Sequence, residues 1–252
     1  MSVQGIDVSK HQGTIDWNKV KKAGVQFAMI RAGFGRNNID PQFKRNVTEC
    51  NRLGIPCGVY WFSYAYTEAM AKKEAAYCLA AIKPYKIEYP VCFDLEYDTV
   101  KYAKTKGVTI NKYLADKLVQ AFCSGIEKAG YYAMNYANQD YLKNMFPADT
   151  TKEYDLWYAY YHDKNNRSDA GIWQHSSTGK VDGIAGSVDL DIAYKDYPAL
   201  IRRAGLNRLK SVLDQAAETV QKKAGLDDTT IAYMKKHTHA EELFTKLARA
   251  MK

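Results

Sequence analysis

The sequence predicts an α/β fold, an irregular barrel of strands and crossover helices that is followed by a small helical appendage. Over the first 200 residues, short apolar segments alternate with segments of helical period, which is typical of a parallel sheet. The eight strand-like runs within about 195 residues are enough to close a small barrel. After residue 197 the alternation stops and only helical spacing remains.

The eight predicted strands are short, apolar, and rich in β-branched and aromatic residues. In chain order they cover residues 5–8, 27–32, 58–64, 91–95, 131–135, 156–160, 172–174 and 190–193. Helices are predicted where apolar side chains recur three or four positions apart. In chain order they cover residues 16–23, 41–53, 68–81, 111–129 and 137–144. Little helical sequence separates the last strands, so we expect the barrel to be irregular there.

The change of pattern after Pro198 predicts two domains, a barrel at 1–200 and a helical module at 201–252. The apolar positions of the module step by three and four along a first helix, namely Leu206, Leu209, Leu213, Ala216 and Val220. Gly225 ends this helix, and Asp227 or Asp228 begins another that extends through 240–251. The 47 residues from Leu206 to the end of the sequence can form only a marginal core. We therefore expect the module to pack on the barrel, to self-associate as a dimer, or to bind a partner.

Composition excludes several classes of protein. With 46% hydrophobic and 25% charged residues, the chain is globular. No apolar run approaches the roughly 18 residues that span a bilayer, so we expect no membrane segment. The first residues lack the basic and then apolar character of a signal peptide, which predicts synthesis in the cytoplasm without an export signal. Five cysteines without a C-x-x-C pair indicate reduced, buried thiols, and no metal or cofactor is expected.

The net charge of +8 is concentrated near the C-terminus. Residues 202–252 contain eleven lysines and arginines against six acids. Such a basic segment suits an anionic polymer, namely nucleic acid, a membrane surface or a bacterial wall. The sequence shows no helix-turn-helix, zinc finger or aromatic RNA-binding motif, and its basic residues alternate with acids. Nucleic acid is therefore not expected as a partner.

Acidic residues at the ends of the predicted strands are the main chemical signal. Asp94 and Glu96 share one face of a strand, with α carbons about 6.6 Å apart at the usual rise per residue. Two close carboxyls raise the pKa of one of them, which makes that group a proton donor near neutral pH. Asp7 ends the first strand, and Asp189 and Asp191 flank the start of the last one. First and last strands are neighbours in a closed barrel, so these acids meet at one mouth. Taken alone, an Asp-x-Glu is more often a pair of solvated acids or helix N-caps.

Several motifs in order resemble the family 25 glycoside hydrolases, the Chalaropsis-type lysozymes or N-acetylmuramidases. They are Gly-Ile-Asp-Val-Ser-Lys-His-Gln-Gly at 5–13, Ile-Asp-Trp at 15–17, the segment 27–35, Gly-Val-Tyr-Trp-Phe-Ser-Tyr at 58–64, Phe-Asp-Leu-Glu at 93–96, Trp-Gln at 173–174 and Val-Asp-Leu at 188–190. The resemblance implies an irregular (β/α) TIM-like barrel. It also implies hydrolysis of the β-1,4 bond from N-acetylmuramic acid to N-acetylglucosamine in peptidoglycan.

Carried over by position, the resemblance assigns catalytic roles to four acids. Glu96 is the expected general acid/base, and Asp7, Asp94 and Asp189 are the accompanying acids. Asp189 and Asp191 would share a face of the strand, so the choice of Asp189 rests on the resemblance alone.

The resemblance also suggests substrate contacts, since aromatic faces pack on sugar rings. Tyr60, Tyr136 and Trp157 are the best groove candidates, and Arg31 is placed to meet a lactyl or peptide carboxylate. His11 and His175 lie near motifs without a second ligand at metal spacing, so we interpret them as structural or polar contacts.

Some positions depart from the pattern of other members. Where many carry Lys-x-Ser/Thr-Glu-Gly after the second strand, this chain has Arg-Ala-Gly-Phe-Gly at 31–35, which puts substrate contacts there in doubt. The usual Trp-Gln-Tyr ends in His175, and the residue after Leu190, often Asn, is Asp191. The four catalytic acids are unaffected.

For the mechanism, we favour an attack by the substrate's own acetamido group, oriented by Asp94, with net retention. A direct Asp nucleophile and an inverting water stay open, because a sequence does not give the separation of the carboxyl groups. A muramidase with a basic tail and no signal peptide resembles a phage or prophage endolysin released by a holin, and a bacterial autolysin is the competing source. The alternatives in function are a catalytically silent wall-binding protein and a chitin-cleaving enzyme.

Overall fold

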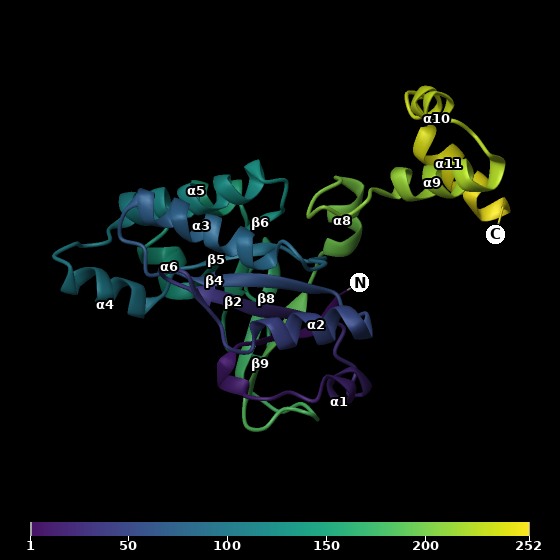
Figure 1. Cartoon of the computed structure of the whole chain (residues 1–252). Helices are drawn as coiled ribbons and strands as arrows, with labels where there is room; N and C mark the ends of the chain where they lie inside the picture. Colours follow the sequence, from purple (N-terminus) through teal and green to yellow (C-terminus); the bar gives the residue numbers. More distant parts are fainter. Residues whose placement is uncertain (1, 252) are drawn as a thin grey trace. The chain divides into compact units, whose positions relative to one another are not determined.

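The computed structural model describes residues 2–251 and divides the chain into two compact units, with the boundary between Tyr197 and Pro198. The first unit is a closed barrel of strands surrounded by helices, and the second unit is entirely helical (Figure 1). The predicted α/β barrel is therefore confirmed.

Eight strands form the barrel, and a short ninth lies beside β2. Around the barrel the order is β1-β2-β4-β5-β6-β7-β8-β9, and β9 pairs with β1 to close it. The strand bounds are β1 Val3–Val8, β2 Phe27–Phe34, β3 Asn38–Ile39, β4 Cys57–Phe62, β5 Val91–Asp94, β6 Ala133–Asn138, β7 Asp155–Ala159, β8 Ala170–Gly179 and β9 Val188–Ala193.

The strands do not all run in one direction. From β1 through β8 all neighbouring barrel strands are parallel, but β9 is antiparallel to both β8 and β1. The prediction of a parallel sheet is thus wrong for the last strand. The physical reason is the connection at 180–187, which is too short for the crossover that a parallel pair requires. The expected irregularity of the barrel is found at this closure.

The five predicted helices are present, with ends shifted by a few residues. Their bounds are α1 Trp17–Lys22, α2 Phe43–Leu53, α3 Glu68–Ile82, α5 Lys112–Lys128 and α6 Gln139–Asn144. Side chains of Asp16, Thr67, Asn111 and Asn138 accept backbone hydrogen bonds at four of their N-termini. Three further helices and a 3-10 turn were not predicted from the sequence, namely α4 Tyr97–Thr105, α7 Ala148–Glu153, α8 Tyr197–Arg203 and η1 Lys10–Gln12.

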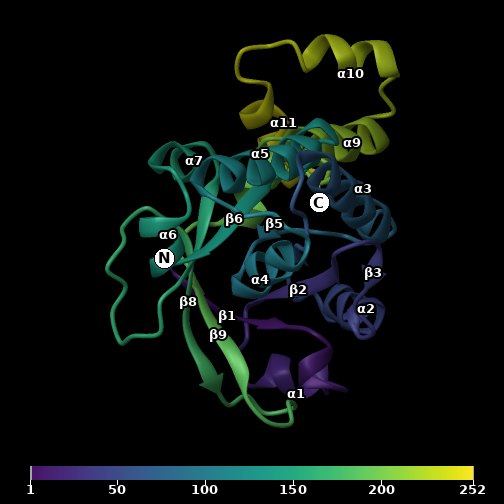
Figure 2. The same ribbon diagram turned by 90° about the vertical axis from the view of Figure 1, so that its left-hand side faces the viewer.

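The helices cover the outside of the barrel. Figure 2 shows α3 and α5 side by side along one flank, while α2 lies next to β2 and β3. Their apolar faces and the outward faces of the strands form one continuous core. The five cysteines are buried and unpaired, in agreement with the sequence analysis. No helix within residues 2–251 is long and apolar enough to cross a membrane.

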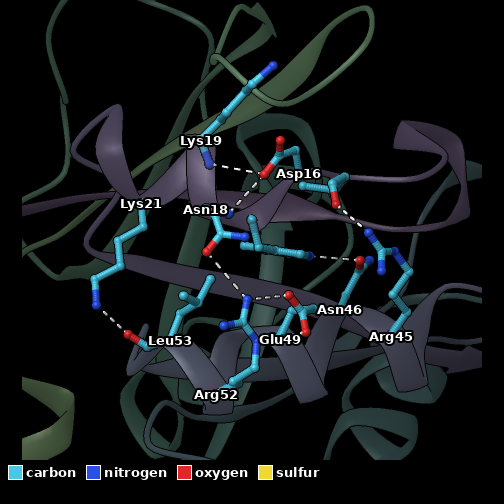
Figure 3. A network of polar contacts seen from close by, with 11 residues as sticks. Asp16, Asn18, Lys19, Lys21, Arg45, Asn46, Glu49, Arg52 and Leu53 are labelled. Atoms are coloured by element: carbon cyan, nitrogen blue, oxygen red, sulfur yellow. Dashed lines mark hydrogen bonds and ion pairs between the residues drawn. The ribbon is translucent and has the colours of Figure 1, made fainter.

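A polar network ties the first two helices together (Figure 3). The Asp16 carboxylate accepts the backbone N–H groups of Asn18 and Lys19 and so begins α1. From α2, Arg45 donates to the carbonyl of Ile15 at 2.8 Å, and Asn46 accepts the Trp17 indole N–H at 3.1 Å. These bonds fix the segment that follows β1, the strand that carries Asp7.

The second unit contains more helices than predicted. Its helices α9 Val212–Ala224, α10 Asp228–Met234 and α11 Ala240–Ala250 enclose a small core around Phe244. Leu206 and Leu209 lie before the first of these helices, because Asn207 and Arg208 adopt positive φ angles and Ser211 caps α9. Asp227 caps α10 as one of the two alternatives proposed. The break between α10 and α11 was not foreseen.

Candidate active site

A cavity of about 380 Å³ opens at the carboxyl ends of the parallel strands. All eight residues singled out in the sequence contribute to its wall, namely Asp7, Arg31, Tyr60, Asp94, Glu96, Tyr136, Trp157 and Asp189. Six more residues line it, namely Ser9, His11, Gln12, Phe62, Tyr161 and Gln174. The site is therefore assembled from all eight barrel strands and from segments that follow them.

Asp94 and Glu96 occupy the end of β5. Asp94 is the last residue of the strand and is 4% exposed, whereas Glu96 is half-buried at the N-terminus of α4. The Glu96 backbone N–H donates to the Thr99 hydroxyl at 3.2 Å, and that hydroxyl donates to the Ser63 carbonyl at 2.6 Å. Thr99 thus fixes the turn that brings both carboxyls into one cavity.

The two carboxyls differ in their surroundings. Burial, then the charges of Asp98 and Asp189, raise the pKa of Glu96 to about 6. Burial and the charge of Glu96 raise the pKa of Asp94, while Arg31 opposes the change. The Oδ1 atom of Asp94 is buried and has no hydrogen-bond partner among the described residues. One carboxyl is therefore suited to deliver a proton, and the other has a buried oxygen that accepts no hydrogen bond from the described residues.

Gln174, from β8, connects Asp7 to the aromatic wall. Its amide N–H donates to Asp7 at 2.6 Å, and its carbonyl accepts the hydroxyls of Tyr136 at 3.0 Å and Tyr161 at 3.2 Å. Sequence reasoning quoted Gln174 within a motif but assigned it no role. Burial and the charges of Asp191 and Asp189 raise the pKa of Asp7, and the bond from Gln174 opposes this.

Asp189 and Asp191 lie at different depths on the same face of β9. Asp189 is half-buried, pairs with Asp7 in the register of β1 and β9, and lines the cavity. Asp191 is 1% exposed, lies outside the lining, and accepts the indole N–H of Trp157 at 2.7 Å. Burial raises the pKa of Asp191 to about 8, so this carboxyl holds a proton at neutral pH. The geometry places Asp189, and not Asp191, within reach of a ligand.

Asp191→Asn is expected to flatten the dependence of the melting temperature on pH. Because the folded chain raises the pKa of Asp191 from 3.8 to about 8, the stabilisation is complete at acid pH and declines as pH rises through that interval. Asparagine never ionises, so the variant gains stability over the wild type near pH 8 and much less near pH 5. Calorimetry at both pH values checks this, and an equal shift at both would contradict it.

Arg31 is already engaged within the protein. Its Nε atom forms a buried ion pair with Asp40 at 2.8 Å, and Asp40 also accepts the backbone N–H groups of Lys10 and Gln42. The Nη2 atom of Arg31 is buried without a partner among the described residues. Arg31 therefore presents a fixed guanidinium to the cavity. Burial and the charge of Arg31 lower the pKa of the neighbouring His11, which keeps that ring neutral.

The aromatic candidates form walls instead of open platforms. The rings of Tyr60 and Tyr136 both meet Trp157 edge to face, with centroids 5.6 and 5.1 Å apart. Exposed fractions of 8% for Tyr60, 6% for Tyr136 and 2% for Trp157 show how little of each ring remains open. Tyr161, which sequence reasoning missed, is 55% exposed and is the open aromatic ring of the site.

The acids of the cavity do not form a metal-binding group. Among residues 2–251, no set of three or more His, Cys, Asp or Glu side chains is arranged to hold a metal ion. The arrangement consists of a proton donor, a buried carboxyl with a free acceptor, further acids and aromatic walls.

Activity is expected to fall as pH rises through about 6, because Glu96 must carry a proton to donate one and its pKa lies there. Asp98→Asn removes the largest charge effect on that pKa, so the alkaline limb should move to lower pH by a fraction of a unit. Profiles of kcat/KM against pH measure the shift, with exposed Asp149→Asn as the control. A limb that stays in place in Asp98→Asn would show that another group governs it.

A barrel with two unlike carboxyls at one strand end, supported by further acids and aromatic walls, defines a glycosidase of the paired-carboxyl type. The comparison with known proteins agrees. The chain belongs to the glycosyl hydrolases family 25, which it matches over residues 6–184.

Two curated relatives show how far the similarity extends. The uncharacterized protein YegX of Escherichia coli O157:H7 is 30% identical over 199 residues, which are 76% of this chain and 69% of that protein. The autolytic lysozyme of Clostridium acetobutylicum is 28% identical over 191 residues, or 75% of this chain and 55% of that protein.

Solved structures give the same result. The modular autolysin LytC of Streptococcus pneumoniae, in complex with a synthetic peptidoglycan ligand, has a TM-score of 0.68 at 27% identity, covering 77% of this chain and 47% of that chain. This chain thus spans about half of LytC. A family 25 glycosyl hydrolase of Bacillus anthracis has a TM-score of 0.66 at 26% identity, covering 77% of this chain and 89% of that chain. The bacterial lysozyme of Streptomyces coelicolor has a TM-score of 0.64 at 25% identity, covering 80% of this chain and 96% of that chain.

Proposed function

We propose that this glycosidase hydrolyses the β-1,4 bond between N-acetylmuramic acid and N-acetylglucosamine of bacterial peptidoglycan. The observation that carries the proposal is the pair Asp94 and Glu96 in one cavity of a family 25 barrel. The similarity to an autolytic lysozyme and to an autolysin bound to a peptidoglycan ligand supports the choice of substrate. The enzyme would act at the bacterial wall after release from the cytoplasm where it is made, through a holin if it is a phage product.

In the proposed reaction Glu96 gives its proton to the leaving oxygen of the glycosidic bond. The acetamido carbonyl of the muramic acid attacks the anomeric carbon as that bond breaks, and the charged ring that results is stabilised by ionised Asp94. The free Oδ1 of Asp94 accepts the acetamido N–H and so orients the group. The Glu96 carboxylate then takes a proton from water, which attacks the anomeric carbon and restores the acetamide. Two displacements give net retention.

The remaining acids have supporting roles in this proposal. Asp7 and Asp189 surround the anomeric position and favour positive charge there. Gln174 holds Asp7 in place through its 2.6 Å bond. A direct Asp nucleophile also gives retention, whereas an inverting water gives the opposite anomer. The anomer first released, observed by proton NMR, separates inversion from the other two.

Digestion of purified peptidoglycan tests the substrate and the bond. Mass spectrometry of the new reducing ends is expected to find muramic acid. Glucosamine ends would make the enzyme a glucosaminidase or chitinase-like hydrolase, and no new ends would leave a catalytically silent wall-binding protein.

For the second unit we propose that it holds the enzyme on the wall, either by direct binding or by self-association. Its basic composition suits an anionic polymer. A hollow of about 400 Å³ in this unit is lined by Tyr233, Lys236 and His237 together with Met234, Thr238 and Leu243, and Tyr233 is 79% exposed.

A chain shortened to end at Ala204 is expected to cut soluble glycan chains at the wild-type rate but to lose lysis of intact cells. The cavity residues all lie upstream of that point, and residues up to 197 form a compact unit of their own. Part of the loss should be reproduced by high salt, which screens exposed charges beyond about 8 Å. Sedimentation of both chains shows whether a dimer is lost. Undiminished lysis by the shortened chain would refute the targeting role.

A further inference from the structure

A second cavity of about 330 Å³ lies outside the catalytic one and shares no lining residue with it. Its wall is formed by the turn between β2 and β3, by the segment that continues β4, and by α3 and α4. The lining residues are Arg36, Tyr64, Tyr66, Met70, Lys73, Glu74, Tyr77 and Tyr102. Four tyrosines and two cations thus line one small cavity, and the proposed catalytic mechanism uses none of them.

Three of the four tyrosine rings pack against one another, and a lysine covers a face of one of them. Tyr64 meets Tyr102 nearly perpendicularly, with centroids 5.3 Å apart, and Tyr66 is tilted against Tyr102 at 6.1 Å. Lys106 lies over the Tyr102 ring at 5.2 Å. A sugar ring needs an open aromatic face to stack on, so this cavity is poorly suited to a pyranose.

The polar groups of the cavity are mainly free donors. The side chains of Arg36 and Lys73 form no ion pair among residues 2–251, and the hydroxyls of the four tyrosines form no hydrogen bond there. The carboxylate of Glu74 is occupied internally, since it accepts the Ser63 hydroxyl at 2.6 Å and the Tyr64 backbone N–H at 3.0 Å. Unpaired cations and free hydroxyls around one space are complementary to a carboxylate.

The cavity is adjacent to the catalytic one. Tyr60, Phe62 and Tyr64 alternate along one face of β4 and its continuation. Tyr60 and Phe62 line the catalytic cavity, and Phe62 contacts Tyr64 with ring centroids 5.3 Å apart. The pair Phe62 and Tyr64 is therefore a shared wall between the two cavities.

The geometry points to a specificity site for the acidic stem peptide of the substrate, with a stem carboxylate held by Arg36, Lys73 and the tyrosine hydroxyls. The inference rests on the proposed function, because the stem is attached to the muramic acid whose bond is cut. In this inference the second cavity binds the stem peptide, whereas the catalytic cavity binds and cleaves the sugar chain.

The double variant Arg36→Ala/Lys73→Ala tests this on two substrates, glycan strands with intact stems and the same strands after an amidase has removed the stems. On stem-bearing strands KM is expected to rise about tenfold with kcat unchanged, the size of effect that a lost charged contact produces. On stem-free strands neither constant should change. Tyr102→Phe, which removes only a hydroxyl, should give a smaller rise in KM on the same substrate alone.

The control Lys44→Ala/Lys72→Ala removes two exposed positive charges outside the cavity and should leave both substrates unaffected. An equal loss on both substrates, or no change on stem-bearing strands, would overturn the inference. Failure of the proposed function is distinguishable, since wild-type enzyme would then release muramic acid ends from neither substrate.

Discussion

Glu96→Gln is expected to lower turnover of peptidoglycan by about 10² to 10⁴, the usual contribution of a general acid. Glutamine keeps the size and most hydrogen bonds of the side chain, but it has no proton to give. Glu96 lies at the cavity wall with a pKa raised to about 6, mainly by burial, so the wild-type side chain is a competent donor at mildly acid pH. Folding should persist, because the side chain is only half-buried.

The assay counts new reducing ends, with KM determined alongside kcat. Binding to insoluble peptidoglycan by the inactive variant shows that the groove is intact. The exposed acid Glu68, on α3 and outside the cavity, supplies the control Glu68→Gln, which should be fully active. If Glu96→Gln keeps more than about a third of wild-type turnover, Glu96 is not the general acid.

Asp94→Asn is expected to have the second largest effect, a loss of about 10² or more in kcat with little change in KM. An amide still accepts the acetamido N–H, but it cannot stabilise positive charge on the ring that forms. Burial is the main cause of the raised pKa of Asp94, and the charge of Glu96 is the second. When Glu96 carries the proton for the leaving group, this second cause is absent, and Arg31 then favours the ionised form of Asp94.

A substrate without the acetamido group separates this role from a simple charge effect. On N-deacetylated glycan the wild-type enzyme should be slow, and Asp94→Asn should be about as slow, because neither has an internal nucleophile to assist. If the variant loses activity equally on acetylated and deacetylated glycan, Asp94 acts as a direct nucleophile or a general electrostatic group. Near-normal activity on the acetylated substrate would exclude both roles.

Much of the candidate site was predictable, because strand periodicity indicates which residues lie at the ends of strands. Asp7 and Asp94 each lie at the carboxyl end of a strand, where a parallel barrel gathers its polar groups. The resemblance then named Glu96 and the aromatic walls, and all of these line one cavity. Which of Asp189 and Asp191 faces that cavity depends on depth along β9. The alternation of side chains along a strand places both residues on the same face, but it does not indicate how deeply each is buried.

The features that the sequence did not predict depend on contacts between distant segments or on local backbone angles. Arg31 is held by Asp40, whose own position depends on the turn after β3, so a sequence pattern could not show that the guanidinium is already paired. The direction of β9 follows from a connection without a helix, and propensity does not encode that direction. The break at Asn207 and Arg208 comes from left-handed backbone angles in residues that do not demand them.

The pairing of β9 with β1 has a consequence for the order in which the chain acquires activity. Asp7 and the Gln174 that holds it are 167 positions apart, and they meet only when the barrel closes. Contacts of such separation form slowly during folding, because a long loop must be ordered before they are made. A nascent chain that has completed β1 through β7 therefore contains Asp7, Asp94 and Glu96, but it lacks Asp189 and the Gln174 that holds Asp7. We therefore expect activity to appear only when β9 joins the barrel. On refolding, a spectroscopic probe of barrel closure should report the same rate constant as the recovery of activity.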